Sequence, residues 1–484
     1  MRHVSMPNVS STGSCSAGED ARLHAWNAGS PRTRSGHVIL TEKHKGDSQV
    51  EDIGERAIRR AMWRLVPLLC LCYLIAYLDR VNAGFAKLQM NTSLGLDDSM
   101  FGFGAGMFFI AYFLLGVPSN LVLERVGARR WIACIMITWG AISACFAFLQ
   151  PIGHAIGLSN EYTFYLLRFL LGMAEAGFFP GVVLFLTLWF PALYRARLIG
   201  LFTLAAPFSS MLGAPLSGAL LNVTGSGLAG WQWLFLLEGF PAILMAFVVL
   251  GYLTDGPDKA AWLAANERQW LIANLDSERH RKEKVGRPSF FKAISDPRIL
   301  ALAAVYFSLG GMSYGVGFFL PTIVKGFGLS NFHTGIVTAV PFFFGAAGML
   351  LLTRHSDKTG ERKGHVAFAL FLTALGAAMS VLFDDPVLKI ACFCVSQIGI
   401  SSLPPLFWTL PASFLTGTAA AAGIAAINSL GNLASFLGPY ILGYSKNATG
   451  SFSFGLLILA GVSAIGALIA LALRHDRAQE VAVS

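Results

Sequence analysis

The chain has 484 residues, of which 55% are hydrophobic and only 13% are charged. Soluble domains usually carry about 25% charged residues, so this composition excludes an ordinary soluble globular protein. The formal net charge of +9 is that of many nucleic-acid-binding proteins. Here, however, the basic residues are concentrated in short segments between apolar runs, which indicates a role in membrane topology.

Apolar runs of about 20 residues, the length needed to cross about 30 Å of hydrocarbon, recur along the chain. We predict twelve membrane-spanning helices, at residues 62–87, 99–122, 131–150, 162–190, 197–221, 232–253, 299–324, 333–353, 365–383, 387–411, 420–445 and 452–473. The fold class expected is an all-α membrane protein with two six-helix bundles. The expected divisions are a disordered tail at 1–60, a first bundle at 61–253, a linker at 254–298, a second bundle at 299–474 and a short tail at 475–484.

Basic residues are distributed unequally between the loops that join these spans. The even-numbered loops carry 18 Lys and Arg residues, whereas the odd-numbered loops carry four. By the positive-inside rule the even loops are cytoplasmic, so both termini are predicted to lie in the cytoplasm of a bacterial inner-membrane protein. The first 60 residues lack the apolar core of a signal peptide. In the linker, Trp262, Trp270 and Leu271 are expected to anchor a surface helix at the membrane interface, with a plain linker helix as the alternative.

Cysteine and histidine spacing gives no sign of a disulfide framework or a metal site. Cys70 and Cys72, like Cys392 and Cys394, are two residues apart and point to different sides of a helix. We expect no metal and no cofactor. No motif places a nucleophile beside a base, and no P-loop is present, so neither an enzyme nor an ATP-driven pump is indicated.

Two similar charged segments follow the second and eighth predicted spans, namely "LERVGARR" and "SDKTGERK". Each has an acid, a base, a glycine two residues later and then further bases. Such repetition is typical of transporters built from two six-helix bundles around a central site. We predict a latch at the cytoplasmic face, with chance charge beside a membrane as the alternative. The candidate gate residues are Glu124, Arg125, Gly127, Arg129, Arg130, Asp357, Lys358 and Arg362.

The segment "LERVGARR" resembles the signature between helices 2 and 3 of the major facilitator superfamily, G-x-x-x-D-R-x-G-R-R. Asn120 replaces its first glycine, Glu124 its aspartate and Ala128 one arginine. "GAPLSG" at 213–218 resembles the superfamily's Gly-Pro motif. Together "YLDRVNAGFAKLQMN", "RFLLGMAEAGFFPG" and "GWQWLFLLEGFP" are similar to the anion:cation symporter family, over about residues 56–475. That resemblance implies a carrier of organic anions such as tartrate, galactonate, phthalate or hydroxyphenylacetate.

Five charged residues fall inside the predicted spans, each at a cost of about 2.5–3.5 kcal/mol at a helix centre. They are the bases Arg80 and Arg168 and the acids Asp79, Glu175 and Glu238. Arg168 and Glu175 are seven residues apart and share a helix face, whereas the adjacent Asp79 and Arg80 diverge by about 100°. The first and fourth spans run in opposite directions, which brings four of these charges to a similar depth. Glu238 is expected to be structural, with a hydrogen bond near the outer rim.

We expect Asp79 to lie near Arg168 and Arg80 to be free for a substrate carboxylate. Burial favours the neutral form of a carboxylic acid, so Asp79 and Glu175 can exchange protons while an arginine holds the substrate. A purely structural salt-bridge network is the alternative. The resemblance implies the same roles, since the family's proton-coupling acids match Asp79 and Glu175, and its neighbouring arginines match Arg80 and Arg168.

Further polar and aromatic residues on the spans are candidates for a central cavity. They are Tyr77, Asn82, Tyr112, Tyr314, Gln397, Trp408, Asn428, Ser429 and Asn432. Tyr77 and Tyr112 match cavity positions of the family. Tyr314 and Trp408 fit ordinary helix packing equally well, and Asn428 and Asn432 share one helix face. The second half carries no charge inside its spans, which suits an organic anion with hydroxyls or a ring.

The sequence therefore predicts a proton-coupled symporter that imports an organic carboxylate by alternating access between two bundles. A sodium-coupled carrier, an exchanger and a non-transporting sensor remain as alternatives. The expected partners are the anion, protons and the lipid bilayer, with no nucleic acid, and the protein is expected to be monomeric. A small dicarboxylate or an aromatic acid is favoured as substrate.

Overall fold

The computed structural model describes residues 35–283, 296–414 and 418–473, with the side chains of 35–52 and of a few later residues left out of the description. The chain divides into two units, Met1–Asp52 and Ile53–Ser484, and the second unit contains the bundles. Within the described ranges the regular elements are helices, as predicted for this fold class.

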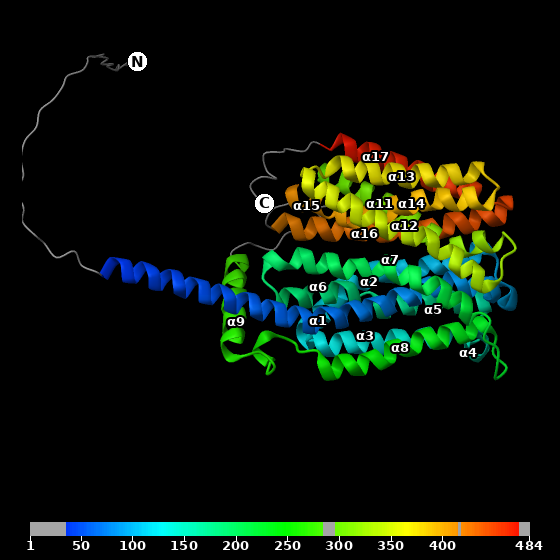
Figure 1. Ribbon diagram of the computed structural model, residues 1–484. Helices are drawn as coiled ribbons and strands as arrows, with labels where there is room; N and C mark the ends of the chain where they lie inside the picture. The colour runs from blue at the N-terminus through cyan, green and yellow to red at the C-terminus, as the bar shows by residue number, and fades with distance from the viewer. Residues whose placement is uncertain (1–34, 284–295, 415–417, 474–484) are drawn as a thin grey trace, which may run out of the picture. The chain divides into compact units, whose positions relative to one another are not determined.

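The first group of helices, drawn from blue to green in Figure 1, corresponds to the first six predicted spans. Its members are α1 (Ser35–Leu94), α2 (Asp98–Val126), α3 (Ala128–Phe146), α4 (Leu149–Ile156), α5 (Asn160–Glu175), α6 (Phe178–Trp189), α7 (Ala192–Leu220) and α8 (Gly230–Tyr252). The fourth span is divided between α5 and α6. A short helix, α4, bends away from the end of α3 by 90°.

The second group corresponds to the last six predicted spans. A 3-10 turn, η1 (Pro257–Lys259), and the linker helix α9 (Ala265–Glu283) precede α11 (Pro297–Lys325), α12 (Asn331–Thr359), α13 (Lys363–Leu382), α14 (Pro386–Phe407), α15 (Thr409–Phe414), α16 (Thr418–Thr449) and α17 (Ser453–Ala472). In the described part of the chain, ten helices are long and apolar enough to cross a membrane, and the bent pair α3 and α4 gives up to 11. With α16, the predicted twelve-span architecture is confirmed.

Side-chain caps fix where several of these helices begin. Asp97 accepts a hydrogen bond of 2.7 Å from the backbone N–H of Met100, and Ser330, Asp296 and Asp385 cap α12, α11 and α14 in the same way. Such caps satisfy N–H groups that have no partner inside the helix. The helix boundaries fall within a few residues of those that hydropathy alone predicts, except that α1 begins at Ser35 and continues to Leu94.

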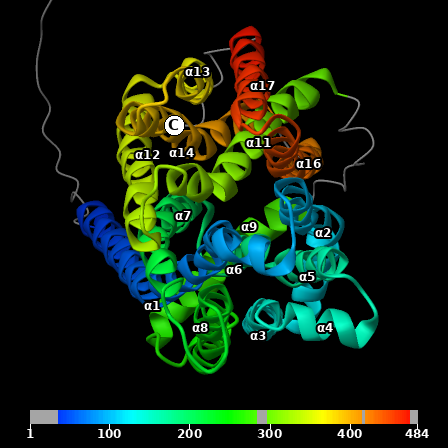
Figure 2. The ribbon, with the colours of Figure 1, turned by 90° about the vertical axis from the view of Figure 1, so that its right-hand side faces the viewer.

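The helix pairs α2 with α16 and α7 with α12 join the two bundles, and α1 also contacts α11. Gly102 of α2 lies against the carbonyl of Pro439, and Gly443 of α16 lies against the carbonyl of Asp98, so these two backbones approach without side chains between them. Asn447 donates to Asp97 at 3.2 Å beside this contact. Figure 2 views the two bundles from the end of the molecule at which these contacts lie.

The α7–α12 pair closes the same end of the molecule. Gly218 and Gly335 lie against the backbone of the partner helix, and Asn331 donates to Asn222 at 3.2 Å. We call this the closed end. The opposite end carries the α2–α3 and α12–α13 loops with their arginines and lysines, and we call it the basic end.

The linker helix α9 crosses the basic end of the first bundle (Figure 1). Glu278 accepts hydrogen bonds from the backbone N–H of Ala192 and from Arg195, both at 2.8 Å. Trp262 stacks on Trp189 with ring centroids 5.4 Å apart, and Trp270 packs beside Gly54. Leu271 is fully buried and cannot anchor at the membrane interface, whereas both tryptophans are half-buried, and their anchoring there stays a prediction.

The start of the first bundle also differs from the expected tail boundary at residue 60. Ala57 and Ile58 are buried, and Arg60 forms an ion pair of 2.9 Å with Glu267 of α9. Residues 53–60 are thus an ordered part of α1. The expected disorder of residues 1–34 falls outside the described residues.

Candidate functional site

Arg80 of α1 and Glu175 at the end of α5 form an ion pair inside the first bundle. Nε of Arg80 donates to Oε1 of Glu175 at 2.8 Å, and Nη2 donates to the same oxygen. The Arg80 side chain is 13% exposed, whereas that of Glu175 is 1% exposed. The guanidinium is therefore the accessible member of the pair.

The remaining donors of Arg80 point toward tyrosine hydroxyls. Nη1 donates to Tyr314 of α11 at 3.2 Å, and Nη2 approaches Tyr112 of α2 at 3.4 Å. The ring of Tyr77 lies 5.0 Å from the guanidinium carbon, a distance typical of a cation–π contact. Because Tyr314 belongs to the second bundle, Arg80 lies where the two bundles meet.

Asp79 points in a different direction from Arg80, as the helical spacing predicts. Its side chain is 1% exposed, and its Oδ1 accepts hydrogen bonds from Ser143 of α3 and, at 3.1 Å, from Asn82 of α1. Asn82 is fully buried beside it, so Asn82 faces this carboxylate and not a cavity between the bundles. The expected placement of Asn82 is wrong in this structure.

The expected arrangement of the charges is confirmed only in part. Arg80 is engaged by Glu175 and is not free. Asp79 interacts electrostatically with Arg168, as expected, although no ion pair joins the two among the described residues. Arg168 is 2% exposed, and the rings of Phe146, Phe164 and Phe318 lie 5.4–6.0 Å from its guanidinium carbon. Its Nε and Nη2 have no hydrogen-bond partner. Spacing identified which residues gather, but it could not distinguish which arginine meets which acid.

The remaining candidate residues lie in the second bundle. Trp408 packs beside Tyr306 with ring centroids 5.1 Å apart, and Gln397 donates to Ser401 at 3.2 Å. On α16, Asn428 is exposed, and Ser429 and Asn432 are half-buried. Tyr314 is thus the second-bundle residue that meets the Arg80–Glu175 pair.

The candidate gate residues lie in two separate loops at the basic end. Arg125, Arg129 and Arg130 are exposed, and Gly127 adopts a φ of 91° between α2 and α3. In the second loop, Arg362 pairs with Asp357 at 2.6 Å, and Lys358 is exposed. The side chain of Glu124 falls outside the described residues. Among the described side chains no ion pair joins one loop to the other, so the latch between them stays a prediction.

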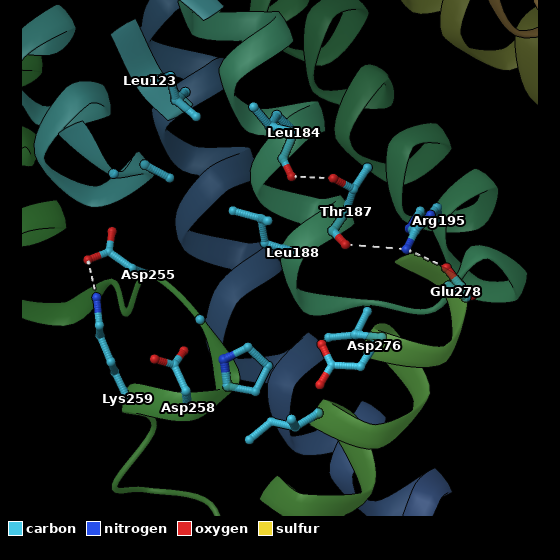
Figure 3. Close-up of a pocket in the computed structure, with 16 residues that line it drawn as sticks. Leu123, Leu184, Thr187, Leu188, Arg195, Asp255, Asp258, Lys259, Asp276 and Glu278 are labelled. Carbon is cyan, nitrogen blue, oxygen red and sulfur yellow. Dashed lines mark hydrogen bonds and ion pairs between the residues drawn. The ribbon is translucent and has the colours of Figure 1, made fainter. Parts of the chain in front are cut away.

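A cavity of about 830 Å³ lies at the basic end, between the first bundle and α9 (Figure 3). Asp255, Asp258, Asp276 and Glu278 line it together with Arg195 and Lys259. Asp255 accepts a hydrogen bond of 3.0 Å from the backbone N–H of Arg129 and so caps α3 from the linker. Four carboxylates in the lining make this cavity a poor site for an organic anion.

Two groups of polar residues were not singled out by the sequence. Lys87 is 5% exposed, forms an ion pair of 2.5 Å with Asp98 and donates to Thr322 of the second bundle at 3.2 Å. Its place at the end of a span suggested a solvated loop residue. Ser143 and Ser217 hold buried carboxylates, and single serines in apolar helices give no distinguishing signal.

Comparison with known proteins places this architecture in a family. Residues 69–439 match the family described as "Major Facilitator Superfamily". The chain belongs to the major facilitator superfamily. It is similar to a "Putative tartrate transporter" of Agrobacterium vitis, 48% identical over 87% of this chain and 95% of the relative. It is also similar to the "Quinolone resistance transporter" of Acinetobacter baumannii, 40% identical over 86% of this chain and 95% of the relative.

Solved structures of the major facilitator superfamily show the same fold at low sequence identity. The xylose transporter XylE from E. coli, in its inward open conformation, superposes with a TM-score of 0.68, 14% identity and coverage of 87% of this chain and 99% of that one. A bacterial homologue of the human lysosomal transporter Spinster gives a TM-score of 0.66 at 16% identity, covering 84% and 95%. The protein is accordingly a multi-pass membrane transporter of this superfamily and not an enzyme.

Proposed function

We propose that this transporter imports an organic carboxylate together with protons by alternating access between its two bundles. The observation that carries the proposal is the position of Arg80, which Glu175 holds from the first bundle and Tyr314 contacts from the second. One guanidinium thereby joins a titratable acid to the interface that must open and close.

The coupling follows from competition for this guanidinium. A planar guanidinium suits a carboxylate, so a substrate carboxylate that binds Arg80 displaces Glu175 from it. Glu175 is almost fully buried, and a buried carboxylate without its counterion favours its neutral form. Substrate binding and proton uptake then support one another, which is the thermodynamic requirement for symport.

The two ends of the molecule support alternating access. Backbone contacts and side-chain hydrogen bonds join the bundles at the closed end, whereas no described ion pair joins the two gate loops at the basic end. We place the basic end, with both termini, in the cytoplasm of a bacterial cell, since basic loops are retained there. The structure then represents a state that is closed to the outside.

For the substrate, we propose a hydroxylated dicarboxylate of the tartrate type. The relatives from Agrobacterium vitis carry the name of a tartrate transporter, and they cover nearly the whole chain. Arg80 supplies charge for one carboxylate, and the hydroxyls of Tyr112 and Tyr314 beside it supply hydrogen bonds for further oxygens. The second bundle adds no buried charge of its own among its described residues.

Uptake into proteoliposomes tests the proposal. Tartrate and a panel of sugar acids and aromatic acids are supplied outside, with either an inward proton gradient, an inward sodium gradient or unlabelled substrate inside. Of these three conditions, we expect only the inward proton gradient to drive accumulation of a hydroxylated dicarboxylate. Accumulation driven only by sodium or only by internal substrate would contradict proton coupling, and binding without flux would indicate a sensor.

A further inference from the structure

Lys87 of α1 is a buried cation that the proposed transport step does not use. Its side chain is 4% exposed, and its ammonium group lies at the closed end, where α1 meets α11 of the second bundle. Glu238 is another charge outside that step, and it accepts a hydrogen bond of 2.9 Å from Ser217 within the first bundle. Lys87 differs from Glu238 because its contacts come from both bundles.

The ammonium group of Lys87 has three N–H donors, and its contacts divide between the two bundles. In the first bundle, Asp98 forms an ion pair of 2.5 Å, and the ring centroid of Phe101 lies 5.6 Å from Nζ. In the second bundle, Thr322 accepts a hydrogen bond of 3.2 Å, and the ring centroid of Phe319 lies 5.0 Å away. Because the bundles move against one another in alternating access, Asp98 stays with Lys87, whereas Thr322 and Phe319 leave with α11.

Lys87 lies on the same face of α1 as Arg80. Seven residues are nearly two helical turns, so the two side chains project in similar directions, about 10 Å apart along the helix axis. Three contacts along α11 cover this face, namely Arg80 with Tyr314, Gly84 with the carbonyl of Phe318, and Lys87 with Thr322. Movement of α11 away from α1 therefore uncovers both cations on one wall of one space.

A buried charge at the closed end needs a reason beyond holding the bundles together. Taking two ions out of water is costly, and well-packed apolar side chains of similar volume stabilise an interface at least as well. Glycine contacts between the backbones already join the bundles there. Ionisable residues inside membrane proteins commonly mark the path of an ion or a substrate.

Departure of α11 leaves the ammonium group of Lys87 with a free donor. The N–H that donates to Thr322 then faces the space between the bundles, while Asp98 keeps its ion pair. A carboxylate replaces the Thr322 hydroxyl favourably, because it adds the attraction of opposite charges to the hydrogen bond. Since Arg80 lies deeper in the same space, an anion that enters from the closed end meets Lys87 first.

We propose that Lys87 is an entry site for the organic carboxylate in the state that is open to the outside. The anion takes the place of Thr322 on the ammonium group and then moves about 10 Å along α1 to Arg80. Asp98 offsets the charge of Lys87, so the anion is held weakly enough to move on. The inference rests on the proposed function, from which it takes the substrate class and the direction of import.

Initial rates of uptake of labelled tartrate by cells that express the full chain test the entry site from the outer face. The variant is Lys87→Met combined with Asp98→Asn, so that no carboxylate is left unpaired to repel the anion. Its KM should rise about tenfold or more, with little change in the maximal rate, because the loss concerns a charged hydrogen bond to the incoming substrate. An unchanged KM would overturn the entry site.

Thr322→Val is the matched control. It removes the same hydrogen bond between the bundles but keeps the ammonium group, so it should not raise the KM. If Thr322→Val raises the KM as much as the double variant does, Lys87 acts only by holding the closed end together, and the inference is overturned.

Chemical rescue of Lys87→Cys, again combined with Asp98→Asn, tests the charge within one folded variant. A methanethiosulfonate reagent that carries an aminoethyl group rebuilds an ammonium group at this position and should return the KM toward the parent value. The methyl reagent adds no charge and should not. The parent protein treated with both reagents controls for its own cysteines, such as the exposed Cys134. Failure of rescue, or equal rescue by both reagents, would overturn the entry site.

The parent protein distinguishes this inference from the function on which it rests. If the parent imports neither tartrate nor any other carboxylate, the proposed function is overturned, and the entry site with it. If the parent imports tartrate and the double variant does so with the parent's KM, only the entry site is overturned.

Discussion

The hydroxyl of Tyr314 on α11 accepts a hydrogen bond of 3.2 Å from Nη1 of Arg80 on α1. This bond connects the two bundles at the group that also holds Glu175. Any movement that separates α11 from α1 must break it. The contacts of Arg80 therefore depend both on the ionisation of Glu175 and on the relative position of the two bundles.

Removal of this cross-bundle bond should weaken substrate binding. A hydrogen bond to a charged group contributes about 1.5–3 kcal/mol, so Tyr314→Phe should raise the KM of uptake by about tenfold or more. The matched control is Tyr306→Phe on the same helix, whose ring packs on Phe407. An equal rise in KM for both variants would contradict a specific role for Tyr314.

Arg80→Lys should reduce the initial rate of uptake by more than about tenfold. An ammonium group is a point charge, and it cannot serve Glu175 and two tyrosines with the geometry of a guanidinium. Uptake is measured with equal amounts of reconstituted protein. Arg197→Lys, at an exposed position, is the control that should retain the rate. Normal uptake by Arg80→Lys would rule out bidentate recognition at this site.

Glu175→Gln should separate exchange from accumulation. The amide cannot release a proton, so a pH gradient should no longer drive accumulation, while counterflow of labelled against unlabelled substrate should persist. Both assays use the same vesicles, which makes counterflow the internal control for folding. Undiminished pH-driven accumulation would show that Glu175 is not the coupling acid.

The buried ion pair at the closed end should respond unequally to loss of its two members. Asp98→Asn leaves the ammonium of Lys87 buried between the rings of Phe101 and Phe319 without its counterion. Such a buried unpaired charge costs about 3–5 kcal/mol of the free energy of unfolding. Lys87→Met keeps the apolar packing, so its Tm should fall less. A larger loss of Tm for Lys87→Met would contradict this account.

The pKa of Glu361 predicts that this residue contributes to the stability of the basic end in a pH-dependent way. Burial raises the pKa of Glu361, but the N–H groups of Gly364 and His365 and the His365 ring hold its carboxylate, and its pKa lies below the ordinary value of 4.5. A depressed pKa stabilises the fold above the unfolded value, and this contribution is lost as the pH falls through the folded value.

Glu361→Gln should therefore lower the Tm at neutral pH, and the difference from the parent protein should shrink as the pH falls below 4.5. The measurement is thermal unfolding in detergent across this range. Asp384→Asn, at a fully exposed position, is the control. A difference in Tm that does not change with pH would show that the cap depends on shape and not on charge.

Hydropathy predicted the helices well because membrane helices must be both long and apolar, and no other pattern in the chain satisfies both conditions. The same reasoning identified the five charged residues that lie inside the spans. Their partners were not predictable, because rotation of each helix about its axis is fixed by packing. Arg80 meets Glu175, and Asp79 meets Ser143, through contacts between residues 95 and 64 positions apart.

Residues near the ends of the spans were predicted less well. A tryptophan beside a membrane suits the lipid interface and a protein contact equally, and Trp262 stacks on the ring of Trp189. Lys87 follows an apolar run and was assigned to a loop, yet Asp98 from the next helix allows it to be buried. In both cases a residue remote in sequence decided the environment.

The glycine contacts at the closed end have a practical consequence. Gly443 lies against the carbonyl of Asp98 and Gly335 against that of Ala214, so even one methyl group there would act as a wedge between the bundles. The bundles pack tightly at the closed end mainly because these glycines let the two backbones approach each other, and less because of hydrogen bonds or ion pairs. Alanine at these positions offers a way to trap the opposite conformation for study without touching a single charged residue.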